Sequence, residues 1–233
     1  MTQSAALRAR LDGVRDRIAR AAVRAGRDPS SVRLVAISKT VPADVVRAAV
    51  DLGQLEFGEN RVQEALDKMD RTADLPIRWH LVGHLQSNKA RKAGARFDLI
   101  HSVDDPGLIA KLEDAAAAAG RRVQLLVEVD LAGETTKHGV RPEEVGAILA
   151  AAAPCRAVQL CGLMVLPPAV ADPEAARPYF TALRRLRDDL RAAAADGSAL
   201  PDLSMGMSHD FEVAVEEGAT MVRVGSAIFG PRA

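Results

Sequence analysis

The sequence has little that would place it in a membrane, in an oxidising compartment or on nucleic acid. No apolar run is long enough to span a bilayer, and the N-terminus lacks the apolar core of a signal peptide. The only two cysteines, Cys155 and Cys161, form no CxxC pair, which argues against a disulfide framework and fits thiols in a reducing cytosol. The formal net charge of +0 provides no global field for nucleic acid or anionic lipid. We therefore expect a cytoplasmic protein with no nucleic-acid or membrane partner.

What the sequence does contain favours one globular domain over residues 1–233. The chain length and the 48% share of hydrophobic residues suit a sizeable core. Residues 4–25 are expected to form an amphipathic helix that ends near Gly26. Apolar side chains recur there at helical spacing, namely Leu7, Leu11, Val14, Ile18 and Ala22. We expect residues 1–30 to pack as an N-terminal helix on the rest of the domain.

Eight short apolar segments then alternate with segments of helical composition. The expected strands are 34–38, 55–58, 77–82, 99–102, 123–130, 158–165, 203–207 and 221–225, and the expected helices or turns between them are 42–52, 61–69, 86–93, 104–119, 142–152, 174–195 and 209–217. This alternation implies parallel strands with right-handed crossovers, and eight units predict a closed (β/α)8 TIM barrel. The alternative is an open doubly wound sheet, although no GxGxxG follows the first strand.

Lys39 is the most unusual of only six lysines, because it directly follows an apolar strand. Alternation places Val35, Ile37 and Lys39 on one face, at the strand end where barrels carry their chemistry. Partial burial there would disfavour the ammonium form and leave a neutral amine able to condense with an aldehyde. The alternative is a strand-end lysine whose ammonium reaches solvent.

Arg223 interrupts the apolar segment 221–224, and a guanidinium in that setting needs an acceptor. It could contact a bound ligand, or it could form an internal ion pair with Glu59 or Asp130. Asn60, which follows the second strand, could orient a ligand or the lysine, or it could cap the next helix.

Ser and Gly residues follow the last two strands, where barrels often bind phosphate. Met207 and Ser208 follow the seventh strand, and Gly225 and Ser226 follow the eighth. Backbone N–H groups and hydroxyls in such loops can hold a phosphate. Ordinary turn chemistry is the alternative, with Ser208 capping the helix expected at 209–217.

Other polar residues carry weaker signals. His80 and His84 are separated by a strand-to-loop change that spoils helical pairing, so we expect no metal site. His138 and His209 are expected in loops. The spacing of Glu128, Asp130 and Glu134 is not specific for acid–base chemistry.

Several of these residues belong to longer motifs that resemble the YggS/PROSC family, the pyridoxal 5′-phosphate (PLP) homeostasis proteins. The resemblance runs from about residue 30 to residue 230. The motifs are VAISKT at 35–40, FGENRVQE at 57–64, WHLVGHLQSNK at 79–89, GLM at 162–164, LSMGMS at 203–208 and MVRVGSAIFG at 221–230.

The resemblance implies a barrel like the N-terminal domain of bacterial alanine racemase, with PLP as cofactor. It implies that Lys39 carries the PLP Schiff base and that Arg223 lies near the pyridine nitrogen. The remaining cofactor-binding residues we predict are Asn60, Met207, Ser208, Gly225 and Ser226. Lys89 and Lys137 are candidate secondary PLP sites.

Three functions compete: a PLP carrier or reservoir, a PLP-dependent amino-acid racemase, and a cofactor-free Schiff-base aldolase. The aldolase alternative does not explain the paired phosphate loops. Racemisation needs a base on each face of the substrate, and bacterial alanine racemases take a tyrosine from a second domain that we do not expect here. The only tyrosine is Tyr179, in an expected helix.

Arg223 also argues against catalysis, because a donor at the pyridine nitrogen keeps that nitrogen unprotonated and makes PLP a poor electron sink. We therefore predict a monomeric carrier in vitamin B6 homeostasis rather than an enzyme. PLP-dependent apo-enzymes are candidate recipients.

Overall fold

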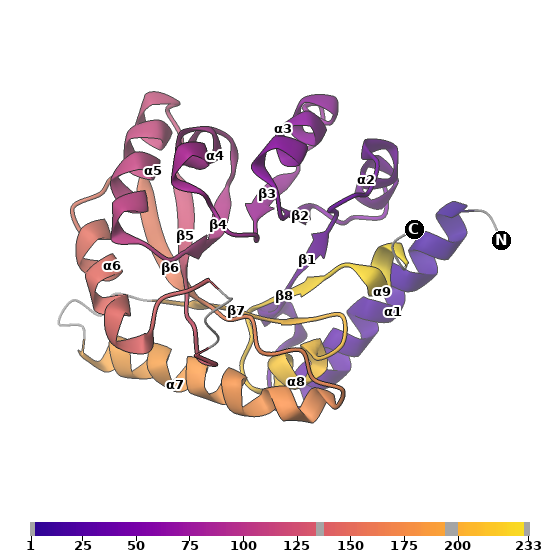
Figure 1. Ribbon diagram of the computed structural model, residues 1–233. Coiled ribbons are helices and arrows are strands. Elements are labelled where there is room, and N and C mark those ends of the chain that lie inside the picture. The colour runs from indigo at the N-terminus through magenta and orange to yellow at the C-terminus, as the bar shows by residue number, and fades with distance from the viewer. Residues whose placement is uncertain (1–2, 134–137, 194–199, 231–233) are drawn as a thin grey trace.

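The computed structural model describes residues 3–133, 138–193 and 200–230. Its strands form a closed, all-parallel barrel in chain order, and β1 pairs with β8 to complete it (Figure 1). The strands are β1 Arg33–Ile37, β2 Glu56–Glu59, β3 Arg78–Leu81, β4 Leu99–Val103, β5 Val123–Glu128, β6 Val158–Met164, β7 Asp202–Met207 and β8 Met221–Val224. The predicted (β/α)8 barrel is confirmed, and the open sheet is wrong.

Helices surround the barrel. They are α1 Gln3–Arg24, α2 Ala43–Val50, α3 Val62–Arg71, α4 Ala90–Arg96, α5 Pro106–Ala118, α6 Val145–Ala152, α7 Arg177–Ala193, α8 Phe211–Glu216 and α9 Ser226–Phe229. Three expected helices begin as 3-10 turns, at Ser87–Lys89, Pro142–Glu144 and Pro173–Ala176. The sequence pattern does not predict the short α9 directly after β8. The end of the helix expected at 174–195 lies outside the described residues.

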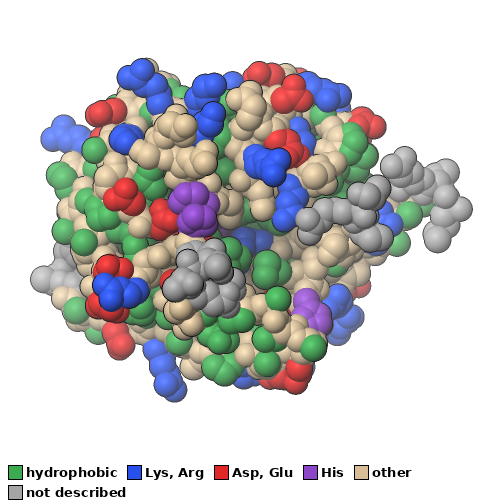
Figure 2. All heavy atoms as spheres, in the orientation of Figure 1, with side chains coloured by type: hydrophobic (Ala, Val, Ile, Leu, Met, Phe, Trp, Pro, Cys, Tyr) green, Lys and Arg blue, Asp and Glu red, His purple; other side chains and the backbone are tan. Residues whose placement is uncertain are grey.

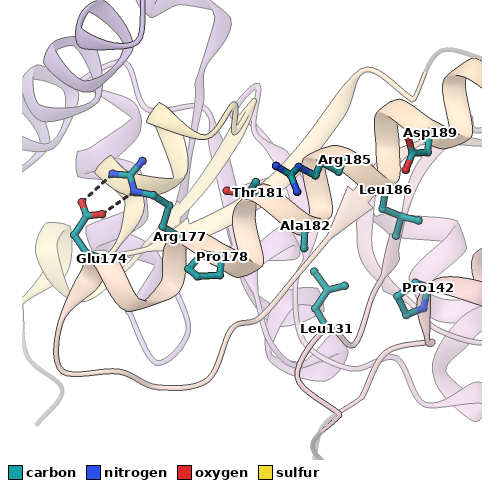
Figure 3. A pocket seen from close by; sticks show the side chains of 10 residues that line it. All are labelled: Leu131, Pro142, Glu174, Arg177, Pro178, Thr181, Ala182, Arg185, Leu186 and Asp189. Atoms are coloured by element: carbon teal, nitrogen blue, oxygen red, sulfur yellow. Dashed lines mark hydrogen bonds and ion pairs between the residues drawn. The ribbon is translucent and has the colours of Figure 1, made fainter.

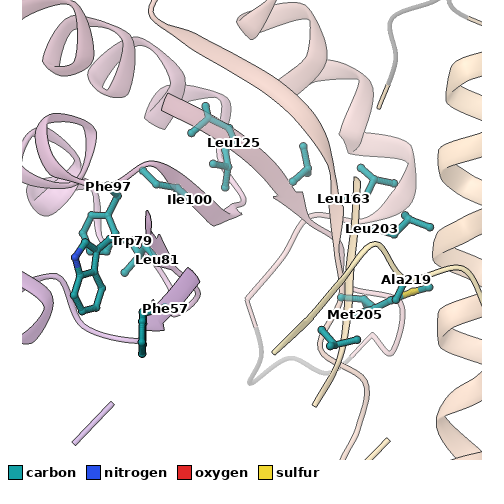
Figure 4. Close-up of a cluster of buried hydrophobic side chains, with 14 of the residues drawn as sticks. Phe57, Trp79, Leu81, Phe97, Ile100, Leu125, Leu163, Leu203, Met205 and Ala219 are labelled. Carbon is teal, nitrogen blue, oxygen red and sulfur yellow. The ribbon is translucent and has the colours of Figure 1, made fainter. Parts of the chain in front are cut away.

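Most of the core lies between the strands and the outer helices. Figure 4 shows part of this layer, where Phe57, Trp79, Leu81 and Phe97 pack together. Phe57 and Trp79 are tilted aromatic neighbours with ring centroids 5.8 Å apart. A smaller apolar cluster belongs to the barrel interior. It consists of Val35, Ile37, Val82, Leu99, Leu126, Cys161, Met164 and Met221.

Strand alternation decides which side chains enter the barrel from β1. Val35 and Ile37 join the inner cluster, whereas Ala36 between them joins the outer core. β1 ends one residue earlier than expected, and Ser38 still donates its N–H to Gly58 O at 3.0 Å. The next residue along the same face is therefore Lys39, at the C-terminal mouth of the barrel.

The N-terminal helix α1 lies against the last helices of the chain. Arg17 pairs with Glu212 at 2.7 Å, and its guanidinium lies 4.5 Å from the ring centroid of Phe211. Arg24 pairs with Glu216 at 2.7 Å. Near the other end of α1, Arg10 Nε donates to the carbonyl of Ile228 in α9 at 2.5 Å. The helix thus fastens α8 and α9 along its length.

Candidate functional site

A cavity of about 1100 Å³ opens at the carboxyl ends of the strands. Figure 2 shows this face with a central hollow that contains basic side chains. All the predicted cofactor-binding residues line the cavity: Lys39, Asn60, Met207, Ser208, Arg223, Gly225 and Ser226. Three residues of α1 also line it, Ser4, Leu7 and Arg10, and sequence reasoning did not anticipate them. The cavity therefore collects residues from both ends of the chain.

Lys39 is half-buried in a tight turn after β1. The next residue, Thr40, has a left-handed backbone with φ of 63°, which is uncommon for a residue other than glycine. The N–H of Thr40 donates to Glu64 Oε1 at 2.5 Å. The turn is thus held from α3, and it presents the lysine to the cavity.

A buried lysine of α3 also stabilises this turn, through hydrogen bonds from its ammonium group. Lys68 Nζ donates to the carbonyl of Ser38 at 2.6 Å, to Glu59 Oε1 at 2.7 Å and to Glu64 Oε1 at 2.8 Å. Ser38 Oγ also donates to Glu59 Oε1, at 2.6 Å. We call this set, Ser38, Glu59, Glu64 and Lys68, the lysine clamp. It ties the turn that contains Lys39 to β2 and α3.

The charges of the clamp are largely shielded from water. The side chain of Glu59 is 0% exposed and that of Lys68 is 7% exposed. Burial raises the pKa of Glu59, and the hydrogen bonds from Lys68 and Ser38 oppose that rise. Glu64 is more exposed, and its pKa is lowered by Lys68 and by the N–H of Thr40, against a rise from burial.

Sequence reasoning missed Lys68, which lies in a segment whose composition predicts only an ordinary helix. A signal was present, because Val62, Ala65 and Met69 mark the buried stripe of α3 and Lys68 lies three residues after Ala65. Lysine is so often exposed that this spacing alone does not reveal a buried one. The sequence suggests Glu59 as a possible ion-pair partner of Arg223, whereas its side chain binds Ser38 and Lys68.

The loops after β7 and β8 meet at Ser208. Its hydroxyl accepts from the N–H of Gly225 at 3.2 Å and from the N–H of Ala227 at 3.4 Å. Ser208 therefore does not cap the helix that follows it, and α8 has Asp210 at its N-cap position without a side-chain cap. Asn60 likewise makes no capping bond to α3, whose N-cap position is Arg61.

Arg223 is 3% exposed and lies at the inner wall of the cavity. It donates to Ser204 Oγ at 2.6 Å and to the carbonyl of Val165 at 2.9 Å. Among the described residues, no ion pair joins it to Glu59 or Asp130, so that alternative is wrong. Burial lowers the pKa of Arg223 to about 10, and the negative charge of Glu128 opposes this. The guanidinium therefore remains charged at neutral pH.

A chain of buried hydrogen bonds leads away from Arg223, and its direction follows from donor capacity. A guanidinium can only donate, so Ser204 Oγ accepts from it and is free to donate to His101 Nδ1, 2.8 Å away. His101 Nε2 then carries the proton toward His80 Nδ1 at 2.9 Å. Burial lowers the pKa of His80 to about 3 and that of His101 well below its usual value. Both rings are therefore neutral and orient one another.

The carboxyl groups at the end of β5 and just after it have different surroundings. Glu128 is 4% exposed, and burial, followed by the charge of Asp104, raises its pKa to about 7. Asp130 accepts the N–H groups of Ala132 and Gly133 in a turn that follows the strand, and β5 ends two residues earlier than expected. Glu134 and Lys137 lie outside the described residues. Lys89, the other candidate secondary lysine, is not among the residues that line the cavity.

A second hollow, of about 710 Å³, runs along α7 (Figure 3). Its wall includes Leu131, Pro178 and Leu186, with the ion pair of Glu174 and Arg177 at one end, 2.7 Å between Nε and Oε2. None of the predicted cofactor-binding residues lines it. Tyr179, in the same helix, does not line the barrel cavity.

The fold and cavity define a barrel of the alanine racemase N-terminal type, and a sequence profile of that family, "Alanine racemase, N-terminal domain", matches residues 9–233. Within it the chain belongs to the pyridoxal phosphate homeostasis proteins. It is 44% identical over 223 residues to the pyridoxal phosphate homeostasis protein of Aquifex aeolicus, covering 96% of this chain and 97% of that protein.

The chain is also similar to solved structures of this family and of this fold. PipY of Synechococcus elongatus, in a structure with PLP bound, is 40% identical with a TM-score of 0.84, and the match covers 96% of this chain and 100% of PipY. Alanine racemase of Clostridium difficile has a TM-score of 0.73 at 15% identity, over 97% of this chain and 57% of the racemase. That second likeness concerns the fold alone.

Proposed function

We propose that this chain binds PLP covalently on Lys39 and acts in PLP homeostasis as a carrier or reservoir. The observation that carries the proposal is one cavity that collects a half-buried lysine, a buried arginine and the joined loops at Ser208. These are the three groups that an aldehyde, a pyridine ring and a phosphate require. The similarity to PipY with PLP bound supports the same cofactor.

Each group has a distinct task in this proposal. The amine of Lys39 would condense with the cofactor aldehyde and release water, and the lysine clamp would hold its turn in place. The N–H groups of Gly225 and Ala227, now turned toward Ser208 Oγ, can also serve phosphate oxygens together with the Ser208 and Ser226 hydroxyls. Asn60 and Met207 also line the cavity that would hold the cofactor. The residues present therefore fit PLP.

The same geometry supports holding rather than catalysis. PLP supplies an electron sink to enzymes whose protein stabilises a protonated pyridine nitrogen. Here the cavity offers Arg223, which remains charged and can only donate. Tyr179, the only tyrosine of the chain, lies on α7 away from the cavity. Curated relatives are named as homeostasis proteins.

The assignment is tested by the absorption spectrum of the purified protein before and after borohydride, followed by peptide mapping. Borohydride should fix the cofactor to Lys39, and Lys39→Ala should lose most of the covalent PLP. Lys92→Ala, on an exposed face of α4, is the matched control and should load normally. Label found mainly on another lysine would overturn the assignment. Racemisation of alanine, abolished by Lys39→Ala, would overturn the carrier role.

PLP-dependent apo-enzymes are the proposed recipients, and the monomer and the cytoplasm remain the proposed state and location. In the part of the chain that the structure describes, no helix is both long and apolar enough to cross a membrane. A recipient assay would mix loaded protein with an apo-enzyme and follow the recovery of its activity against an equal concentration of free PLP.

A further inference from the structure

We propose that His84, Asp104 and His138 form a binding site for a divalent transition-metal ion of the zinc class at the rim of the barrel. The three residues follow β3, β4 and β5, and none of them lines the PLP cavity. Figure 2 shows histidine side chains beside acidic ones next to the central hollow. The proposal does not depend on PLP binding.

The three side chains already converge. One ligand atom from each lies within 4.8 Å of the other two. His84 Nδ1 and Asp104 Oδ2 are 3.1 Å apart, and the rings of His84 and His138 are stacked with centroids 3.5 Å apart. Bonds of about 2.0–2.2 Å around a tetrahedral zinc ion place ligand atoms roughly 3.4 Å apart. The pair of His84 and Asp104 has nearly this spacing. A ligand nitrogen of His138 lies within 4.8 Å of both partners, and its stacked ring must turn before that nitrogen faces the ion.

The backbone beneath two of these ligands is firmly placed. A Cβ at Gly83, the residue before His84, would lie 2.3 Å from the carbonyl oxygen of Asn60, so only glycine fits this close approach. Ser102 Oγ also donates to Gly83 O at 2.6 Å. Gly139, after His138, has φ of 116° and packs against Asp130, and Val140 pairs with Val129. The segments that carry His84 and His138 are therefore held next to β4 and β5.

The donor set selects the class of ion. Two imidazole nitrogens and one carboxylate oxygen suit zinc and its transition-metal neighbours, whereas magnesium and calcium prefer oxygen ligands throughout. The side chain of Asp104 is only 12% exposed, so its negative charge is weakly screened, and that of His84 is 33% exposed. Three protein ligands with solvent access leave a fourth position for water.

His84 approaches His138 and not His80, so the expectation of no metal site, which considered the pair of His80 and His84, does not address this cluster. His80 turns into the barrel toward His101, whereas His84 meets Asp104 and His138 from the neighbouring loops. Residues 54 positions apart in the chain come together only because parallel strands end at one face. Spacing within one motif could not reveal the site.

The test is a calorimetric titration of the PLP-free full chain, without a histidine tag, with zinc chloride at pH 7.5. Iodoacetamide treatment beforehand keeps the half-buried thiol of Cys155 from competing. We expect one zinc ion per chain. His138→Ala and Asp104→Asn should each weaken binding at least about tenfold, because even the loss of a group that only supports a ligand costs 10–100-fold. His209→Ala is the control, since this exposed histidine contacts Ala171 O instead.

A second readout separates ligation from damage to the fold. Zinc should raise the unfolding temperature of the wild type and of His209→Ala by more than that of the two ligand variants. In EDTA the two ligand variants should unfold at the same temperature as the wild type. Acidification should release the ion, because imidazole ligands must be neutral. The proposal is overturned if the wild type shows no saturable binding at micromolar protein, or if the two variants bind zinc as tightly as the wild type.

Discussion

Replacing Lys68 with methionine is the most informative single change, because it removes the clamp but preserves side-chain length and helix propensity. Lys68→Met deletes three hydrogen bonds, to the carbonyl of Ser38 and to the carboxylates of Glu59 and Glu64. It leaves Glu59 completely buried without its cation. We expect both lower stability and weaker PLP binding.

The expected loss of stability follows from the burial of Lys68 and Glu59. Removing one partner of a buried ion pair costs about 3–5 kcal/mol, because the remaining charge is left uncompensated. The loss should be smaller at acid pH. Burial already raises the pKa of Glu59, and loss of Lys68 would raise it further, so Glu59 binds a proton in the folded state as the pH falls and the uncompensated charge disappears. Adding Glu59→Gln should recover at least about 1 kcal/mol at neutral pH, because the two residues are in direct contact.

Lys68→Met should weaken PLP binding because the clamp no longer holds the turn that contains Lys39 and Thr40. Fixing the backbone of one residue costs about 1–2 kcal/mol, and the clamp provides this for the left-handed turn at Thr40 before the cofactor arrives. Without the clamp, PLP must order the turn itself. This corresponds to binding that is roughly 5–30-fold weaker.

Urea unfolding followed by circular dichroism gives the stability, and absorbance titration gives the PLP affinity. Lys92→Met is the matched control, because Lys92 is exposed on α4 and its replacement should stay within about 0.5 kcal/mol of the wild type. The reasoning is refuted if Lys68→Met unfolds at the same urea concentration as the control, or if its cost is unchanged in the Glu59→Gln background.

Further changes test the remaining groups. Glu128→Gln should stabilise the protein at pH 8 by up to about 3 kcal/mol and have little effect near pH 4.5. Glu128 keeps its proton up to about pH 7 in the folded wild type but only up to about pH 4.5 in the unfolded chain, so wild-type stability falls as the pH rises through this window. Equal unfolding curves of the wild type and Glu128→Gln at pH 8 would contradict this. Ser208→Ala should weaken PLP about tenfold or more and leave pyridoxal nearly unaffected, because a hydrogen bond to a charged group contributes about 1.5–3 kcal/mol; parallel titrations with both ligands decide. Arg223→Glu should change the absorption spectrum of bound PLP, and an unchanged spectrum and affinity would leave Arg223 with a structural role only.

Local pattern is sufficient for the architecture and for the residues at the strand ends. The run from Val35 to Ile37 alternates between inside and outside, and this alternation alone predicts that Lys39 lies at the barrel mouth. The same logic predicts Ser208 and Gly225 in neighbouring loops, because the ends of consecutive parallel strands lie side by side. The predicted strand ends differ from the observed ones by at most two residues, and the largest difference is at β5, before the turn of Asp130.

What could not be predicted depends on contacts between distant segments. Lys68 is buried only because β1 and β2 place Ser38 and Glu59 beside it, and no local rule distinguishes it from an exposed helical lysine. The chain of hydrogen bonds from Arg223 through Ser204 to His101 crosses the barrel interior. The wall contributed by α1 likewise arises from tertiary packing. The roles predicted for the cofactor-binding residues, and the single domain over residues 1–233, remain predictions.

The closure of the barrel between its first and last strands has a consequence for how the protein is made. Lys39 follows β1, whereas Ser208, Arg223 and Gly225 come with β7 and β8. Arg10 and Ile228, which meet at 2.5 Å, are 218 residues apart in the chain. A ribosome releases these segments in order, so the lysine is synthesised long before the loops opposite it. If PLP binds these residues as proposed, it can give little stability to a nascent chain, and the early strands must fold or remain soluble without it until β8 is in place.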